Sequence, residues 1–249
     1  MASLRFIFIF LKILCALGLL VFFVIFWMYF SVDVKVLKNQ YPHLTHTKDS
    51  FEVVMKSLPP KEWVRLDEIS HHTKWAIIVS EDWSFYEHEG VDFKAMKIAL
   101  DEMIYENKLR GASTITQQMV KNLYLGQQRT LWRKLYEIIL AQKTEKFLKK
   151  EKILEIYLNI IEYGPGIYGI QAASHHYFKK PPSELNPMES AFLAMLLPSP
   201  KRYYDFFKEK RLTSFAREKI RLILIKLRMA KILTPEEYQD VVNSKLNWE

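Results

Sequence analysis

The stretch WAIIVSEDWSFYEHEG, residues 75–90, leads from an apolar run directly into a cluster of acidic residues. We expect a helix from residue 71 to about residue 93. In such a helix Glu81 shares a face with the residues that lie three, four and seven positions away. These residues are Ile77, Ile78, Phe85 and His88. Glu87 and Glu89 point elsewhere, so a single carboxylate lies among apolar side chains.

A carboxyl group that is removed from water has a raised pKa and is a better base near neutral pH. The spacing therefore selects Glu81 as a candidate for proton transfer. A salt bridge is the alternative, because buried carboxylates are usually paired. For His88 taken alone, a structural role is the simpler interpretation.

The composition favours a helical protein. The chain has 249 residues, a formal net charge of +8 and only seven glycines, while Leu, Ile, Lys, Glu and Met are plentiful. Such a balance is typical of helices and not of a sandwich or barrel. Cys15 is the only cysteine, which excludes an intramolecular disulfide. We expect one all-α domain after an apolar N-terminal segment.

Residues 13–32, ILCALGLLVFFVIFWMYFSV, contain no charged side chain. As a helix, this segment spans about 30 Å, the thickness of the hydrocarbon core of a bilayer. A cleaved signal peptide is the alternative, but it requires a shorter apolar region and a cleavage site between small residues. This segment ends in bulky residues, and Trp27 and Tyr29 suit the headgroup region.

Flanking charges predict the orientation of this segment. Arg5 and Lys12 precede it and favour a cytoplasmic N-terminus, although Lys35 and Lys38 follow it. We therefore expect a single-pass membrane protein. Its parts are a short cytoplasmic end over 1–12, a transmembrane anchor over 13–32, a membrane-proximal linker over 33–70 and a domain over 71–249 on the outer side of the membrane.

The excess of positive charge has two candidate partners, nucleic acid and phosphate-bearing lipid at a membrane surface. The lysines accompany no zinc-finger spacing and no glycine–aromatic RNA-binding pattern. We therefore expect phosphorylated lipid and no nucleic acid. The doublets His71–His72 and His175–His176 do not place two ligands on one helix face, so a zinc site is not expected.

Further helices are predicted along the rest of the chain. Apolar residues recur at helical spacing over 93–108, 130–150, 151–163 and 215–233, and the segment 111–125 begins as a turn and continues as a helix. Thr130, Asn186 and Thr234 are predicted N-caps. The glycine-rich run GPGIYG, residues 164–169, predicts a packed loop.

The segment GASTITQQMVKN, residues 111–122, is rich in hydroxyl and amide groups that compete with helical backbone bonding. Such groups suit hydrogen bonds to a sugar or a pyrophosphate, and they are Ser113, Thr114, Thr116, Gln117 and Gln118. Gly111 allows the backbone to approach a ligand. Lys121 offers a compact charge for phosphate. A helix start capped by Ser113 is the structural alternative.

The segment RKLYE, residues 133–137, places Arg133 and Lys134 on the same helix face as Glu137. One interpretation is an exposed ion pair, worth less than ~1 kcal/mol. The other is a carboxylate held beside cations that grip phosphate. Spacing alone leaves both open.

These segments resemble the motifs of the bacterial peptidoglycan glycosyltransferases. EDWSFYEHEGVD is similar to the first motif through Glu81, Asp82, Phe85, His88 and Gly90. GASTITQQMVKN is similar to the second, with Ala112 where the family usually has glycine, and RKLYE to the third. KEKILEIYLN, 150–159, resembles the fourth, and YGPGIYGIQAASHHYFKK, 163–180, the fifth, with Lys179 where glycine is common. The resemblance covers about 60–200, and the shared order is far more specific than any single motif.

The resemblance implies a lysozyme-like helical glycosyltransferase domain that polymerises lipid II into linear glycan strands. In this reaction the acceptor's 4-hydroxyl attacks the anomeric carbon of the growing chain, and undecaprenyl pyrophosphate leaves with inversion. Glu81 is the implied base. Glu137 is a second implied catalytic residue, which either ligates Mg²⁺ on the pyrophosphate or holds Arg133 and Lys134 in place.

The resemblance also assigns the other motif residues. The implied substrate-binding residues are Asp82, Ser113, Gln117, Lys121, Asn122, Arg129, Arg133 and Lys134. The implied structural residues are Phe85, His88, Gly90, Gly111, Tyr157 and Asn159. The implied location is the bacterial cytoplasmic (inner) membrane, with the glycosyltransferase domain over 71–249 on the periplasmic side. An apolar flap within 93–132 is expected to dip into the bilayer.

The implied partners are lipid II, the growing glycan chain, membrane lipid and proteins of cell-wall synthesis or division. No Ser-x-x-Lys or Lys-Thr-Gly motif occurs, so we expect no transpeptidase activity. A glycan-cleaving, lysozyme-like hydrolase is one alternative, but it needs no cations to grip phosphate, so the Lys and Arg residues over 121–134 favour synthesis. A non-catalytic membrane scaffold is the other, and it leaves the polar segment 111–122 unexplained.

Overall fold

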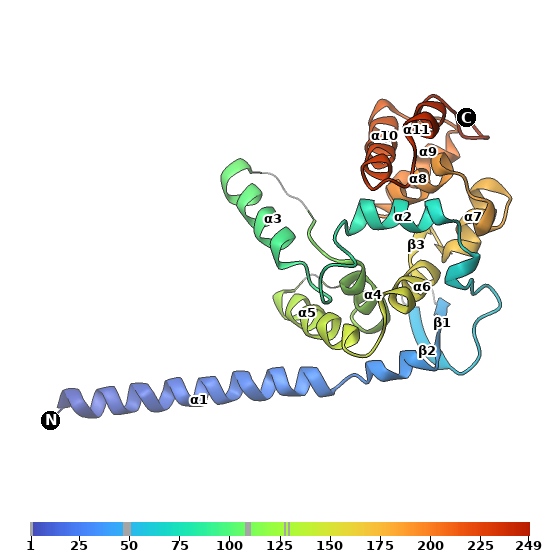
Figure 1. Cartoon of the computed structure of the whole chain (residues 1–249). Helices are drawn as coiled ribbons and strands as arrows, with labels where there is room; N and C mark the ends of the chain where they lie inside the picture. The colour runs from blue at the N-terminus through green and yellow to red at the C-terminus, as the bar shows by residue number, and fades with distance from the viewer. Residues whose placement is uncertain (1, 47–50, 108–110, 127, 129) are drawn as a thin grey trace.

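The computed structural model describes residues 2–46, 51–107, 111–126, 128 and 130–249, and it is mainly helical (Figure 1). The α-helices are α1 Ala2–Phe30, α2 His71–Glu81, α3 Phe93–Glu106, α4 Ile115–Tyr124, α5 Leu131–Glu145, α6 Lys150–Ile160, α7 Ile170–Phe178, α8 Pro187–Leu196, α9 Pro200–Lys208, α10 Ser214–Met229 and α11 Pro235–Val242. Short 3-10 helices are η1 Val34–Lys38, η2 Leu66–Glu68 and η3 Pro182–Glu184. The predicted helical fold class with an apolar N-terminal helix is confirmed.

Two small antiparallel hairpins add to this helical fold. Strand β1, Tyr41–His46, pairs with β2, Phe51–Lys56, and β3, Glu162–Gly164, pairs with β4, Ile167–Tyr168. The second hairpin occupies the glycine-rich run that was predicted as a packed loop. The β1–β2 hairpin lies below α6 in Figure 1, whereas β3 lies within the helical body, in contact with α8 and α9.

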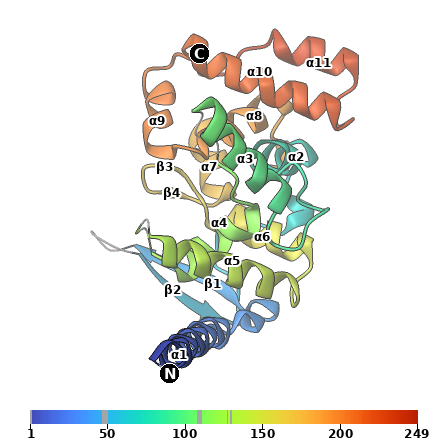
Figure 2. The same cartoon turned by 90° about the vertical axis from the view of Figure 1, so that its left-hand side faces the viewer.

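Helix α1 extends away from the folded body as a long apolar rod (Figures 1 and 2). It is the one helix in the described part of the chain that is long and apolar enough to cross a membrane. The helix starts well before the predicted segment 13–32 and ends at Phe30, so most of the expected cytoplasmic end is helical as well.

The C-terminal end of α1 is fastened to α5. The buried Lys143 donates from Nζ to the carbonyl oxygens of Tyr29 and Val32, at 2.5 and 2.6 Å. A cation is well placed there, because the last carbonyls of a helix carry partial negative charge. The rings of Trp27 and Tyr136 lie 6.5 Å apart at the same joint. The apolar helix is thus positioned by the helix that carries the predicted cations.

The core lies around α8, which is buried from Met188 to Leu196. This helix packs against α2 and α10, while α4 packs against α5 and α6. Removing these apolar side chains from water supplies the main stabilisation of the fold. The two groups of helices are joined where the Asp82 carboxylate, just after α2, accepts a hydrogen bond from the first backbone N–H of α4, that of Ile115.

The described residues 33–46 and 51–70, within the predicted linker, pack onto the folded body. Val34 and Leu37 are completely buried, and the β1–β2 hairpin packs against α6. Asn159 on α6 fixes the segment that follows. Its amide donates to the carbonyl of Val64 and its oxygen accepts from the N–H of Val64, both at 2.8 Å. Long-range contacts thus order the described part of the predicted linker, whose bounds stay a prediction.

Helix α2 ends at Glu81, so the prediction of a helix to residue 93 is wrong. Asp82 adopts φ −158° and ψ 74°, outside the helical region. Its carboxylate bonds the N–H of Ile115 and the ring of His88, each at 2.9 Å, and these tertiary bonds replace a further helical turn. Phe85 is fully buried, but neither it nor His88 shares a helix face with Glu81.

The capping predictions are confirmed. Thr130, Asn186 and Thr234 each accept a hydrogen bond from the backbone N–H three residues later. These bonds satisfy helix N–H groups that have no partner within the helix. Local sequence is sufficient for such ends because both partners lie within one turn.

Candidate active site

A cleft with a volume of about 250 Å³ opens at the end of α2. Its walls come from residues 79–84, the start of α3 at Asp92 and Ala95, the segment 111–114 and Lys226 of α10. The first two predicted motifs therefore meet in one cavity. Helix α10 contributes to it from outside all five motifs.

The carboxylate of Glu81 is held by a chain of hydrogen bonds at this cleft. Gln118 donates from Nε2 to Glu81 Oε2 at 2.8 Å, and the hydroxyl of Tyr157 donates to Gln118 Oε1 at 2.9 Å. The tyrosine thereby fixes the amide so that its NH₂ faces the carboxylate. In the sequence Gln118 is one of several polar side chains over 111–122, and no local spacing pairs it with Glu81.

Burial raises the pKa of Glu81, while the hydrogen bond from Gln118 and the positive charges of Lys226 and Lys121 oppose that rise. A carboxyl group balanced in this way is suited to accept a proton near neutral pH. The neighbouring Asp82 is different, because its carboxylate is turned into the fold toward His88. These hydrogen bonds suit Asp82 to position the site, and its substrate contact stays a prediction.

Gly90 allows the first motif to lie against the second motif and α5. Its φ is +83°, and a Cβ at this position would lie 2.6 Å from the carbonyl oxygen of Ala141. The hydroxyl of Thr114 donates to the Gly90 carbonyl at 2.6 Å. Only glycine satisfies both this backbone conformation and this close approach.

The third motif forms a buried ion cluster on α5. Glu137 is 2% exposed. Arg133 Nη1 lies 2.6 Å from Glu137 Oε2, and Lys134 Nζ lies 2.5 Å from Glu137 Oε1. Lys134 also donates to the hydroxyl of Ser113 at 2.8 Å, which connects the cluster to the cleft wall. The exposed ion pair considered above is therefore excluded.

The charge of Lys121 interacts with both this cluster and Glu81. Burial lowers its pKa, and the negative charges of Glu137 and Glu81 oppose that change, while Arg133 and Lys134 add to it. Arg133, Lys134 and Lys121 carry positive charges against the single negative charge of Glu137. The region is therefore positive overall and can bind an anionic ligand. Ser113, which lines the cleft, is hydrogen-bonded to Lys134 of this cluster.

The donor set does not fit the expected Mg²⁺ at Glu137. Both carboxylate oxygens are engaged by cationic groups, which repel a divalent ion. Among the described residues, no group of three or more His, Cys, Asp or Glu side chains is arranged to hold a metal. Of the two predicted roles of Glu137, the structure fits the one in which it holds Arg133 and Lys134 in place.

Gln117 and Thr114 form the start of α4. Gln117 is completely buried and its Oε1 accepts the N–H of Thr114 at 3.0 Å, while the Thr114 hydroxyl accepts the N–H of Gln117 at 3.1 Å. Thr114, and not Ser113, is thus the cap. Gln117 thus shapes this helix end, and its substrate contact stays a prediction.

The remaining predicted residues are placed as follows. Gly111 lines the cleft, with open space where a Cβ would lie. Asn122 is half-buried on α4, next to Lys121, and its substrate contact stays a prediction. Arg129 lies outside the described residues. Asn159 anchors Val64, as described above.

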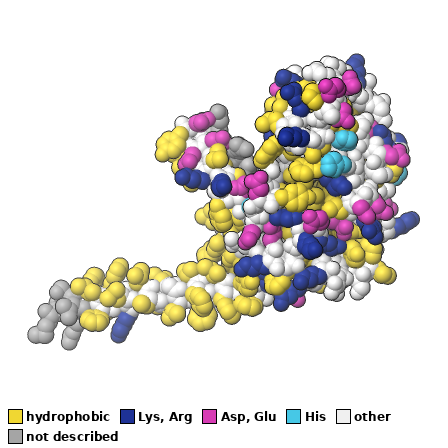
Figure 3. All heavy atoms as spheres, viewed as in Figure 1, with side chains coloured by type: hydrophobic (Ala, Val, Ile, Leu, Met, Phe, Trp, Pro, Cys, Tyr) yellow, Lys and Arg dark blue, Asp and Glu magenta, His cyan; other side chains and the backbone are white. Residues whose placement is uncertain are grey.

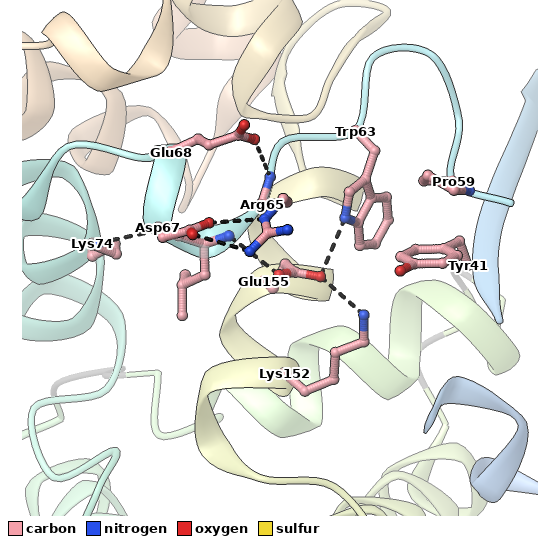
Figure 4. A pocket seen from close by; sticks show the side chains of 10 residues that line it. Tyr41, Pro59, Trp63, Arg65, Asp67, Glu68, Lys74, Lys152 and Glu155 are labelled. Carbon is pink, nitrogen blue, oxygen red and sulfur yellow. Dashed lines mark hydrogen bonds and ion pairs between the residues drawn. The ribbon is translucent and has the colours of Figure 1, made fainter. Parts of the chain in front are cut away.

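A larger cavity of about 820 Å³ lies elsewhere, between β1, η2 and α6 (Figure 4). Its lining shares no residue with the cleft at Glu81. Glu155 accepts hydrogen bonds there from the indole of Trp63 at 3.2 Å and from Lys152 at 2.9 Å. The ammonium of Lys152 also lies 4.5 Å from the ring centroid of Tyr41. These polar groups are satisfied by one another, so we assign the cavity no role in the chemistry.

Comparison with known proteins decides the family. The transglycosylase family model matches residues 51–228, which include the cleft, the ion cluster and Lys226. The chain belongs to the transglycosylase family. A biosynthetic peptidoglycan transglycosylase of Nitrosomonas eutropha is 46% identical to this transglycosylase over 172 residues, which are 68% of each chain.

Two further relatives carry the same name. The protein of Nitrosospira multiformis is 38% identical over 210 residues, covering 84% of this transglycosylase and 87% of the relative. The protein of Methylobacillus flagellatus is 41% identical over 172 residues, covering 69% and 73%. The predicted identification as a peptidoglycan glycosyltransferase is confirmed, and the hydrolase alternative is not favoured.

Proposed function

We propose that this transglycosylase polymerises lipid II into linear glycan strands, with Glu81 as the base. The observation that carries this proposal is a half-buried carboxylate between a fixed amide and a set of cations. The base and the positive charge that the reaction requires thus lie on neighbouring elements, α2, α4 and α5. A hydrolase would need the carboxylate but not the cations.

Proton transfer is the first role of the site. The acceptor's 4-hydroxyl loses its proton to Glu81 as its oxygen bonds to the anomeric carbon of the growing chain. The bond from that carbon to the pyrophosphate breaks on the opposite side, so the configuration inverts. The raised pKa of Glu81 strengthens it as a base, and Gln118 keeps one oxygen in a fixed position.

Stabilisation of the leaving group is the second role. Negative charge develops on the departing pyrophosphate, and prearranged cations in a partly dry site stabilise such charge strongly. Lys134 and Arg133 are held by Glu137 before substrate arrives, so they lose little freedom when it binds. Lys121 completes this set on the side that faces Glu81.

The exposed apolar surface of the molecule supports a lipid-linked substrate. Apolar side chains are exposed on α3 and at the start of α5, on the side of the molecule toward which α1 also extends (Figures 1 and 3). They include Phe93, Ile98, Ile104, Tyr105, Leu131 and Trp132. We propose that α1 anchors the protein in the cytoplasmic membrane, that these side chains enter the outer leaflet and that the catalytic body lies on the outer side.

The test is polymerisation by the full-length protein in proteoliposomes with lipid II. Wild type is expected to yield long glycan strands, and Glu81→Gln none, because glutamine retains the shape but cannot accept the proton. Glu87→Gln is a matched control, since Glu87 is exposed on the adjacent loop. Release of muropeptides from finished sacculi, without any polymer from lipid II, would refute the proposal.

A further inference from the structure

Helix α10 turns one lysine toward the cleft. Its other cations Arg217, Lys219, Arg221 and Arg228 are exposed, whereas Lys226 is half-buried between the buried Ile223 and Leu227. Lys226 lines the same cleft as Glu81. Its Nζ donates to the carbonyl oxygen of Val79 at 2.8 Å, in the last turn of α2.

This contact fastens the end of the helix that carries the base. Carbonyl groups in the last turn of a helix have no partner within the helix, and a cation is favourable there. Helix α10 packs directly against α2, so the lysine comes from a rigid neighbour. The end of α2, where Glu81 stands, is therefore tied to the C-terminal helices.

The charge of Lys226 acts on Glu81 and favours its ionised form. The other two carboxylates of the cleft are already engaged: Asp82 bonds His88 and the N–H of Ile115, and Asp92 bonds Ser84 and the N–H of Ala95. Other titratable groups also face Glu81. These are Asp82 beside it, Lys121 from α4, Tyr157 from α6 and Tyr163 from β3.

We propose that Lys226 is a positioning residue for the base, which ties down the end of α2 and keeps positive charge beside the Glu81 carboxylate. Lys121 stands on the side of the leaving-group cations, and Lys226 is supplied from a different helix. A half-buried carboxylate without such a neighbour would take up a proton more readily and would lose its capacity to act as base. The inference rests on the proposed role of Glu81.

The test compares pH profiles of lipid II polymerisation by full-length variants. Lys226→Met is expected to move the acidic limb of kcat/KM to higher pH by about one unit, which is roughly a tenfold loss of rate on that limb. Lys226→Gln removes the charge but keeps a hydrogen-bond donor, and it is expected to show the same displacement. Lys226→Arg should restore the wild-type limb.

Lys219→Met is the matched control, because it removes an exposed charge from the same helix. Its pH profile is expected to equal that of wild type. Thermal unfolding accompanies each profile, so a loss of folding in Lys226→Met is recognised and Lys226→Gln then decides.

An unchanged acidic limb in a folded Met or Gln variant would overturn the inference, whatever the maximal rate. If Lys226→Arg displaced the acidic limb as far as Lys226→Met does, the inference would also be overturned, because arginine keeps the positive charge beside Glu81. Failure of the proposed function looks different: in that case wild type forms no polymer, or Glu81→Gln still does.

Discussion

Removal of the Tyr157 hydroxyl tests how the base is held. This hydroxyl is completely buried and donates to Gln118 Oε1 at 2.9 Å, while the same amide donates to Glu81 at 2.8 Å. Tyr157→Phe leaves the amide oxygen without its donor, which costs about 1–3 kcal/mol of folding stability. The ring and its packing are retained.

The effect on catalysis follows from the freed amide. Without the hydroxyl, the amide turns over or moves away, and the carboxylate of Glu81 loses a hydrogen bond that favours its charged form. The pKa of Glu81 is then expected to rise by about one further unit, since one unit corresponds to ~1.4 kcal/mol. Below that pKa the ionised fraction, and with it the rate, falls roughly tenfold.

The assay is kcat against pH at saturating lipid II, together with thermal unfolding. Tyr163→Phe is the matched control, because the Tyr163 hydroxyl is also completely buried but has no hydrogen-bond partner among the described residues. Its loss is expected to leave stability unchanged or higher. A Tyr157→Phe enzyme with the wild-type pH profile would refute the reasoning.

Three further outcomes are expected. Glu81→Gln should raise the melting temperature at pH 7 relative to wild type, and this gain should vanish below pH 4.5. The reason is that the pKa of Glu81 is raised in the folded state, so its contribution to stability is present in acid and is lost as pH rises through that pKa. An equal gain at all pH values would contradict this. Glu137→Gln should leave the two cations without a charged partner, cost about 3 kcal/mol in unfolding experiments and lower kcat more than a chelator does. Gly90→Ala should destabilise by roughly 3 kcal/mol because of its positive φ and the contact with α5, whereas Gly111→Ala, in open space, should unfold like wild type.

Local patterns in the sequence determined much of this protein. Thr130, Asn186 and Thr234 cap helices because both partners of each bond lie within one turn. The cluster of Glu137 with its two cations follows from spacings of three and four on one helix. The apolar N-terminal helix follows from composition alone. In each case the interacting groups are neighbours in the chain.

Only the tertiary structure decided where the base stands and what holds it. Periodicity predicted that the helix beginning at residue 71 continues to about residue 93. In the structure this helix, α2, ends at Glu81, because the Asp82 carboxylate bonds to the N–H of Ile115. The partners of Glu81 come from α4 and α10, and no spacing rule relates Gln118 or Lys226 to it. Such contacts form between groups that only the packing of helices brings together, and their energy depends on the exclusion of water at that contact.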